Sequence, residues 1–338
     1  MEVSAEKERD MKFSDLQRRE FISSLAGLSM AAALHGETRD GVIYRNFGPT
    51  GERVSAIGLG GYHIGVPSED EGIRIIRTAL DRGLTFLDNS WDYHDGDSEI
   101  RMGKALRDGY RKRAFLMTKY NGRTRVSAAR QIDESLKRLQ TDHIDLIQFH
   151  ENIRMTDANK YFAPGGAHEA VMAAKKAGKV RYVGFTGHKD PSIHLHMLDM
   201  AAKNGFHFDS CQMPLNVLDY NFRSFAHQVV PRLVAEKTAV LGMKPLASGL
   251  IFKLNDVDAI DCLHYALNLP TSVVINGCES LARLDQAFQA MKTFKPMNEA
   301  QVEALTAKTK KAALTGSIER FKTSEDFDGT THNPSSMG

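Results

Sequence analysis

Short apolar runs alternate with amphipathic stretches along most of the chain. Each run holds four to six residues, and the charged segment that follows has apolar residues at every third or fourth position. The short runs are typical of buried strands, and the wider spacing is typical of helices that pack by one face. The predicted strands are residues 56–60, 85–88, 114–119, 144–149, 180–185, 209–213, 239–243 and 272–275.

This alternation predicts an α/β fold in which eight parallel strands close into a (β/α)8 TIM barrel over residues 41–321. Two shorter runs, 42–44 and 53–54, predict an N-terminal β-hairpin that closes the bottom of the barrel. The competing fold is a doubly wound nucleotide-binding sheet, whose first strand is followed by Gly-x-Gly-x-x-Gly. Residues 58–63 read Gly-Leu-Gly-Gly-Tyr-His and lack the third glycine, which favours the barrel. Residues 322–338 are polar, and we expect them to form a loose C-terminal tail.

The N-terminal residues predict export. Residues 18–21 read Arg-Arg-Glu-Phe and precede an uncharged run, 22–34, that is too short to span a bilayer but suits the core of a signal peptide. The paired arginines resemble the twin-arginine export signal. We therefore expect residues 1–34 to be a signal peptide, the twin-arginine export machinery to be a partner, and the location to be periplasmic or otherwise exported. An amphipathic N-terminal helix is the alternative, but the run 22–34 has no polar face beyond small serines.

Composition adds little to this picture. Lys and Arg number 44 against 42 Asp and Glu, so the net charge of +2 gives no support for a nucleic-acid partner. The three cysteines, Cys211, Cys262 and Cys278, form no Cys-x-x-Cys pair that would predict a zinc ribbon or an iron–sulfur cluster. No metal site is expected.

Candidate catalytic residues follow three neighbouring strands. Catalytic groups of a barrel lie at the C-terminal ends of its strands, where Asp88, Tyr93, Lys119 and His150 are expected to converge. These types suit reduction of a carbonyl group, because the oxygen becomes an alkoxide when hydride reaches the carbon and must then take a proton. Tyr93 would donate that proton, with its pKa lowered by Lys119, which pairs with Asp88. His150 would orient the carbonyl oxygen, and Trp91 is expected to line the substrate pocket beside it.

In this order at successive strand ends, these four residues resemble the catalytic tetrad of the aldo/keto reductase family. The resemblance extends from about residue 44 to residue 291 and includes the motifs at 58–61, 97–99 and 136–146. It implies a barrel that reduces aldehydes, ketones or sugar-like substrates with NADP(H) and without a metal. The partner implied is a small-molecule carbonyl or alcohol compound.

The resemblance also implies nicotinamide contacts at the ends of the later strands. Thr186 and Gln212 match residues that the family uses there. Gly187 stands where the family commonly has Asn, so that contact must move or vanish, and His188 is the nearest replacement. Met243 stands where an aromatic ring often stacks on the nicotinamide, and a thioether can still pack against a ring.

At the adenosine end, Arg283 matches the family's arginine for the 2′-phosphate, whose dianion suits a guanidinium group. Gly277 replaces a frequent lysine, Glu279 adds a negative charge, and Ser280 is a further expected contact. NADPH is therefore expected to be preferred over NADH. The other expected cofactor contacts are Gly61, Tyr62, Asp88, Lys244, Leu246 and Ser248.

Two other functions compete with the reductase. A cofactor-binding regulatory or sensor barrel without significant turnover is compatible with the departures at Gly187 and Met243, although a complete tetrad argues against it. A metal-dependent barrel hydrolase would need His, Asp and Glu clustered at several strand ends, and only His150 and Asp88 stand there.

Overall fold

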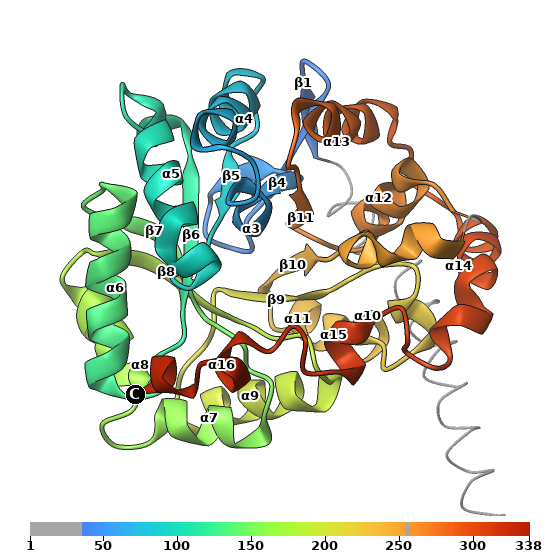
Figure 1. Cartoon of the computed structure of the whole chain (residues 1–338). Helices are drawn as coiled ribbons and strands as arrows, with labels where there is room; N and C mark the ends of the chain where they lie inside the picture. The colour runs from blue at the N-terminus through green and yellow to red at the C-terminus, as the bar shows by residue number, and fades with distance from the viewer. Residues whose placement is uncertain (1–35, 255–256) are drawn as a thin grey trace, which may run out of the picture.

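A computed structural model describes residues 36–254 and 257–338, so the predicted signal peptide at 1–34 lies outside the described residues. In the described part of the chain, eight parallel strands form a closed barrel (Figure 1). This confirms the predicted TIM barrel, and each strand lies within two residues of its predicted ends. The strands are β4 (Ile57–Gly60), β5 (Phe86–Asp88), β6 (Phe115–Tyr120), β7 (Ile144–Phe149), β8 (Val180–Thr186), β9 (Ser210–Pro214), β10 (Ala239–Met243) and β11 (Val273–Gly277).

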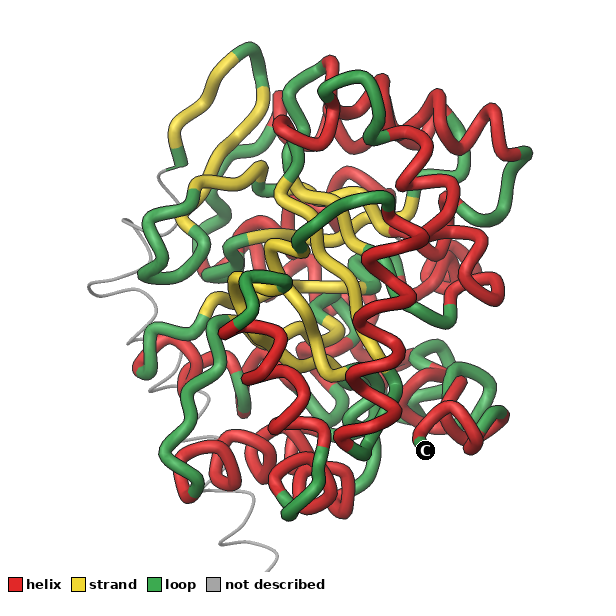
Figure 2. The backbone as a smooth tube through the Cα atoms, turned by 90° about the vertical axis from the view of Figure 1, so that its left-hand side faces the viewer, coloured by secondary structure: helices red, strands yellow, loops and turns green. Residues whose placement is uncertain are grey.

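Helices surround the barrel, as the red tube around the yellow strands in Figure 2 shows. Local signals begin several of them: Ser68 caps α4, and Thr124 and Ser127 form a reciprocal capping box at the start of α6. The outer helices are α4 (Glu69–Asp81), α5 (Asp97–Ala105), α6 (Arg125–Leu139), α8 (Ala167–Lys176), α9 (Pro191–Lys203), α11 (Val230–Ala235), α12 (Ala259–Asn268) and α13 (Leu281–Thr293). Shorter or additional helices are α3 (Gly61–Ile64), α7 (Met155–Phe162), α10 (Phe225–Gln228), α14 (Glu299–Ala313), α15 (Arg320–Thr323) and α16 (Gly329–His332).

An N-terminal antiparallel sheet closes the bottom of the barrel. The predicted hairpin is formed by β2 (Val42–Asn46) and β3 (Arg53–Ser55), and β1 (Glu37–Arg39) adds a third strand that the sequence did not predict. Phe47, which follows β2, is completely buried, and its ring centroid lies 4.9 Å from that of Phe115. Such burial of an aromatic side chain is worth about 3 kcal/mol. The sheet therefore attaches to the barrel through a large apolar contact.

The C-terminal residues form ordered structure, so the prediction of a loose tail at 322–338 was wrong. After α15, the chain continues through α16 and a last turn at Pro334–Met337, and Figure 1 shows this red segment running beside α7 and α9. Lys322 is buried, and its ammonium lies 2.7 Å from Asp219 and 3.0 Å from Glu319. Buried polar partners hold the segment, and such contacts between distant residues leave no local apolar pattern.

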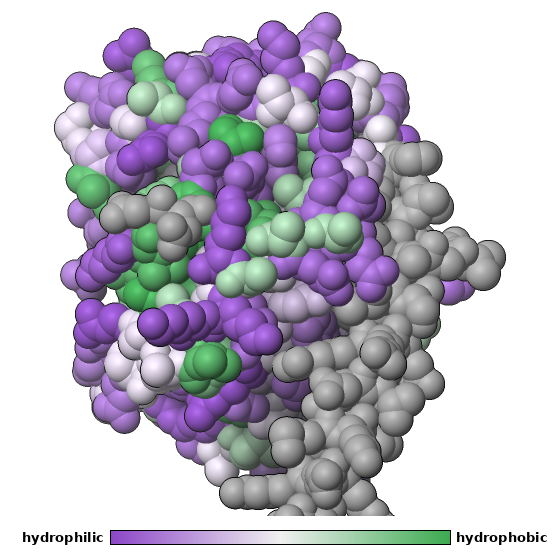
Figure 3. Space-filling model, turned by 90° about the vertical axis from the view of Figure 1, so that its right-hand side faces the viewer, coloured by the Kyte–Doolittle hydropathy of each residue, from purple (hydrophilic) through white to green (hydrophobic). Residues whose placement is uncertain are grey.

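On the face drawn in Figure 3, hydrophilic residues predominate and apolar residues form separate patches. Among the described helices, none is both long enough and apolar enough to cross a bilayer.

Candidate active site

Asp88 and Lys119 form a buried ion pair at the C-terminal end of the barrel. Asp88 ends β5 and Lys119 lies on β6, with Lys119 Nζ 2.5 Å from Asp88 Oδ1. Lys119 also donates to the carbonyl oxygen of Asn89 at 2.8 Å and to the Tyr93 hydroxyl oxygen at 3.3 Å. The other oxygen of Asp88 accepts a hydrogen bond from Gln212 Nε2 at 2.8 Å. The structure thus brings together three residues of the predicted tetrad and one predicted cofactor contact.

Tyr93 opens a strained turn between β5 and α5. The next two residues, His94 and Asp95, have positive φ angles of 52° and 55°. Burial raises the pKa of the Tyr93 phenol well above its usual value, and the nearby carboxylates of Asp88 and Asp92 raise it further. The prediction that Lys119 lowers this pKa was therefore wrong in its net sign. The phenol keeps its proton across neutral pH, which suits a proton donor.

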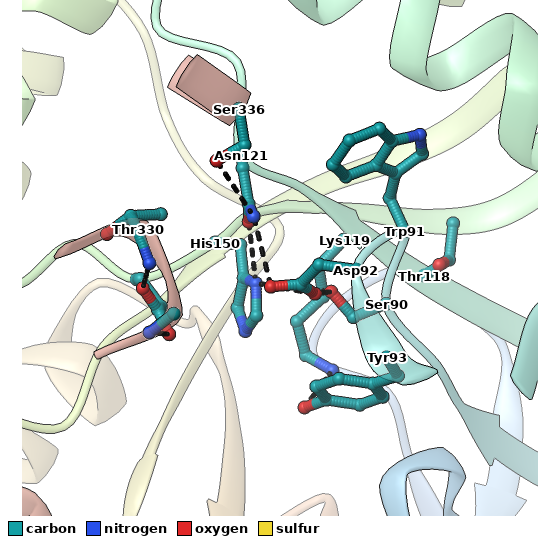
Figure 4. A network of polar contacts seen from close by, with 12 residues as sticks. Ser90, Trp91, Asp92, Tyr93, Thr118, Lys119, Asn121, His150, Thr330 and Ser336 are labelled. Atoms are coloured by element: carbon teal, nitrogen blue, oxygen red, sulfur yellow. Dashed lines mark hydrogen bonds and ion pairs between the residues drawn. The ribbon is translucent and has the colours of Figure 1, made fainter. Parts of the chain in front are cut away.

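His150 follows β7 and completes the tetrad. Its ring centroid lies 5.8 Å from that of Tyr93, in an edge-on arrangement. Its Nδ1 faces three oxygens: Asn121 Oδ1 at 2.8 Å, Ser90 Oγ at 3.1 Å and Asp92 Oδ1 at 3.4 Å (Figure 4). Sequence reasoning missed these partners of His150. Their types are visible in the sequence, but their meeting depends on the relative positions of three strands.

The Trp91 side chain packs against α6. Its indole nitrogen donates to Glu134 on α6 at 2.7 Å, and the guanidinium groups of Arg130 and Arg138 lie within 5.7 Å and 5.4 Å of its ring centroid. Figure 4 shows the indole directed away from Tyr93 and His150. The prediction that Trp91 lines the substrate pocket was therefore wrong, because cation–π contacts with α6 hold the ring there.

The residues predicted to contact the nicotinamide are placed in part where such contacts could form. Gln212 ends close to Asp88, and its side-chain oxygen is buried without a hydrogen-bond partner among the described residues. A buried orphan acceptor of this kind needs a donor, and a carboxamide N–H group supplies one. Thr186 Oγ1 lies 3.9 Å from the sulfur of Met243, so these two predicted residues share one side of the mouth.

Gly187 and His188 serve the structure in ways that the sequence did not indicate. A Cβ atom at Gly187 would lie 2.2 Å from the carbonyl oxygen of Asn152, so no other residue fits there without movement. His188 is buried, and its Nε2 lies 2.9 Å from Asp328 Oδ1 of the C-terminal segment. Lys189 pairs with the same carboxylate at 2.7 Å. The proposed replacement of an Asn contact by His188 is thus not supported, because this ring is bound to Asp328.

The predicted adenosine site carries mixed charges. Arg283 is about half exposed, and its Nε lies 3.9 Å from Glu279, which also lies 3.3 Å from His63 Nδ1. A Cβ atom at Gly277 would lie 2.1 Å from the ring of His63, a partly exposed side chain that would have to move for a larger residue. Ser280 caps α13 by accepting from the backbone N–H of Arg283. The Arg283 guanidinium suits a phosphate, whereas the Glu279 carboxylate opposes one.

The remaining predicted contacts are distributed around the mouth. A Cβ atom at Gly61 would lie 2.4 Å from the carbonyl oxygen of Asp88, and the ring of Tyr62 packs edge-on against Tyr93 at 5.5 Å. Burial, with a smaller contribution from Lys119, lowers the pKa of Lys244 to about 8. Of the last two predicted residues, Leu246 packs against the core, and Ser248 is exposed with a φ of 57°.

The described residues contain no cluster of potential metal ligands. Over residues 36–254 and 257–338, no three His, Cys, Asp or Glu side chains are placed to hold a metal ion.

Comparisons with known proteins agree with this geometry. The chain is 29% identical to the aldo-keto reductase YhdN of Bacillus subtilis over 62% of this chain and 63% of the relative. It is 30% identical to the L-galactose dehydrogenase of Arabidopsis thaliana over 61% of this chain and 66% of the relative, so it covers just under two thirds of each. The solved structure of aldo-keto reductase AKR11C1 from Bacillus halodurans (holo form) superposes with a TM-score of 0.66 at 22% identity over 78% of this chain and 95% of that chain, which supports the fold.

The family profile decides the assignment. The sequence profile described as the aldo/keto reductase family matches residues 56–262, which is more than half of the chain and spans the strands that carry the tetrad. The chain belongs to the aldo/keto reductase family.

Proposed function

We propose that this protein is an NADP(H)-dependent oxidoreductase that transfers hydride between the nicotinamide and the carbon of a carbonyl or alcohol substrate, with Tyr93 as proton donor. The observation that carries the proposal is the buried cluster of Asp88, Lys119 and Tyr93 beside His150. A buried ion pair contributes little net stability, because pairing only partly offsets the desolvation of the two charges. The position of the Asp88–Lys119 pair at the mouth of the barrel therefore favours a chemical role over a structural one.

The chain's own residues divide the work of reduction. Bound NADPH supplies the hydride, and the substrate oxygen then needs a proton. Tyr93 holds that proton because its pKa is raised by burial and by nearby carboxylates. Lys119 fixes the phenol oxygen at 3.3 Å, and Asp88 keeps the ammonium in place. His150 is placed to hold the substrate oxygen by a hydrogen bond.

The nicotinamide end supports the cofactor proposal more strongly than the adenosine end. The orphan oxygen of Gln212 offers an acceptor for a carboxamide, close to Asp88. The preference for NADPH depends on Arg283, whose charge is partly offset by Glu279 at 3.9 Å. Titration of the full chain with NADPH and NADH, followed by nicotinamide fluorescence, measures that preference directly. We expect tighter binding of NADPH.

The proposal is tested by Tyr93→Phe, with Tyr110→Phe as the control. Tyr110 lies on the outside of the barrel, where its hydroxyl contacts Asp81. We expect Tyr93→Phe to lower the rate of NADPH-dependent carbonyl reduction by roughly 10²–10⁴-fold, because a general acid is lost. Binding of NADPH should persist, and Tyr110→Phe should reduce carbonyls at the wild-type rate. Wild-type protein that binds NADPH but reduces no aldehyde, ketone or sugar would instead favour a regulatory barrel.

We propose in addition that the protein is exported by the twin-arginine machinery. The supporting observation is Arg18-Arg19 ahead of the uncharged run 22–34. Replacing both arginines by lysine should keep the protein inside the cytoplasm of a host with an active pathway, as measured by cell fractionation. An Arg74→Lys control should be exported like the wild type. Wild-type protein confined to the cytoplasm would contradict the proposal.

A further inference from the structure

The ring of His150 is surrounded at Nδ1 by hydrogen-bond acceptors. Asp92 Oδ1 accepts the hydroxyl proton of Ser90 at 2.6 Å, and Asp92 Oδ2 accepts from Asn121 Nδ2 at 3.0 Å. Because both donors are used on the carboxylate, Ser90 and Asn121 present only oxygen lone pairs to the ring. The Nδ1 atom of His150 must therefore carry the proton that all three oxygens accept.

This tautomer decides what Nε2 can do. In Figure 4 the second ring nitrogen points away from the network, on the side where the Tyr93 hydroxyl oxygen lies. In a neutral ring with its proton on Nδ1, Nε2 is an acceptor and cannot donate to a carbonyl oxygen. His150 can hold that oxygen by donation only when both nitrogens are protonated.

Asp92 is placed to favour that charged ring. Burial acts to raise the pKa of Asp92, but His150, Ser90 and Asn121 together bring it below its usual value. Asp92 therefore stays a carboxylate 3.4 Å from Nδ1, and a fixed negative charge at this distance stabilises an imidazolium. The arrangement is a carboxylate and histidine pair held by two further hydrogen bonds.

We propose that Asp92 is a positioning residue: together with Ser90 and Asn121 it keeps a proton on Nδ1 of His150, and its carboxylate stabilises the ring when Nε2 donates a hydrogen bond to the carbonyl oxygen. The proposal rests on the function proposed above. In the reduction step, the carbonyl carbon receives a hydride with its electron pair and the π electrons of the C=O bond move to oxygen. The oxygen then takes the phenol proton of Tyr93. The Nε2–H of His150 stabilises the charge on oxygen before that transfer.

Other charged groups face the same space and set the background. Arg123 donates to the His150 carbonyl oxygen at 3.0 Å, and Glu151 accepts from the backbone N–H groups of residues 329 and 330. Tyr93 lies across the ring, and the ammonium groups of Lys119 and Lys244 belong to the same mouth. A single replacement of Asp92 leaves all of these charges in place, so a change in the pH profile reports on the Asp92 carboxylate.

The first test is the pH dependence of kcat/KM for carbonyl reduction by the full chain carrying Asp92→Asn. The control is Asp95→Asn, because Asp95 lies three residues further along the same turn, is exposed, and has a left-handed φ that Asn tolerates. We expect Asp92→Asn to lower kcat/KM and to move its alkaline fall to lower pH, because the His150 ring loses a close opposite charge. Asp95→Asn should keep the wild-type profile. An unchanged alkaline limit in Asp92→Asn would overturn the proposal.

A second measurement needs no variant and no substrate. Nitrogen NMR of the wild-type protein labelled in its histidines should show a proton on Nδ1 of His150 at neutral pH. Protonation of Nε2 alone would overturn the proposal. The two failures are distinguishable: wild-type protein that oxidises no NADPH contradicts the proposed function, whereas an active enzyme with an unmoved profile or the opposite tautomer contradicts only the role of Asp92.

Discussion

The two ends of the barrel hold their residues by different forces. At the bottom, Phe47, Phe86 and Phe115 pack ring against ring, and none is more than slightly exposed. At the mouth, Asp88 and Lys119 are buried to a similar degree but carry charges. Burial stabilises the bottom directly, whereas buried charges cost desolvation that pairing only partly offsets. The comparison teaches that apolar packing holds the bottom of the barrel together, whereas the mouth contains buried charges whose cost is consistent with the proposed chemical role.

The largest expected effect is that of the double replacement Asp88→Asn with Lys119→Met, which should lower activity without lowering stability. Replacing both partners removes the buried charges together, so the free energy of unfolding should stay close to that of wild type. Carbonyl reduction should fall by roughly 10²–10⁴-fold, because the phenol loses its fixed ammonium neighbour. Denaturant unfolding and steady-state rates check both halves of the prediction. A double variant that unfolds several kcal/mol more easily would show that the pair is structural.

Phe47→Ala should give the opposite result at the other end. We expect the free energy of unfolding to fall by about 3–5 kcal/mol, because a large cavity opens at a completely buried site. The rate of the protein that remains folded should stay within about twofold of wild type, since the mouth is untouched. The exposed residue Met172, changed to Ala, is the control for unfolding. A change in kcat without loss of stability would contradict the division between the ends.

His194 links the mouth to pH-dependent stability. It is completely buried behind Gln212, and burial lowers its pKa to about 4. The unfolded chain binds a proton on this residue below about pH 6.5, and the folded chain does so only near pH 4. Stability should therefore fall by about 1.4 kcal/mol per pH unit from this residue as the pH drops through that interval. Unfolding at pH 7.5 and pH 5 should show a smaller decline in His194→Gln, and an equal decline would contradict the assignment.

The smallest effect is expected at the rim of the mouth. Glu279 is about half exposed and lies 3.9 Å from Arg283. Glu279→Gln should increase the preference for NADPH over NADH by about two- to fivefold, because an exposed charge pair is worth no more than about 1 kcal/mol. Glu299→Gln, on α14, is the control. Paired titrations with the two cofactors measure the ratio, and a lower preference for NADPH would contradict the predicted phosphate site.

The sequence predicts features that depend on local pattern and leaves out those that depend on distant contacts. The barrel strands were predicted within two residues because each is a short run of mostly buried residues. The four tetrad residues could be named from the sequence because they lie at the ends of three neighbouring strands or in the turn that follows one of them. The orientation of Trp91 was not predictable, because it depends on Glu134 across the surface of α6.

The C-terminal segment shows the same limit more strongly. The Asn121 side chain lies 3.5 Å from Ser336, and Glu151 binds the backbone of residues 329 and 330. These partners are separated by about two hundred positions in the sequence, so no periodic pattern connects them. A polar composition predicts exposure, whereas here it reflects hydrogen bonds made within the molecule.

The central claim is that the mouth of the barrel transfers hydride from a nicotinamide to a carbonyl carbon. The most direct measurement uses NADPH that carries deuterium at the transferred position, with the full chain and a panel of aldehydes, ketones and sugars, and detects the alcohol product by mass spectrometry. The account predicts one deuterium on the carbinol carbon, formed by wild-type protein and roughly 10²–10⁴-fold more slowly by Tyr93→Phe. Oxidation of NADPH without label in any alcohol, or equal labelling by Tyr93→Phe, would contradict it.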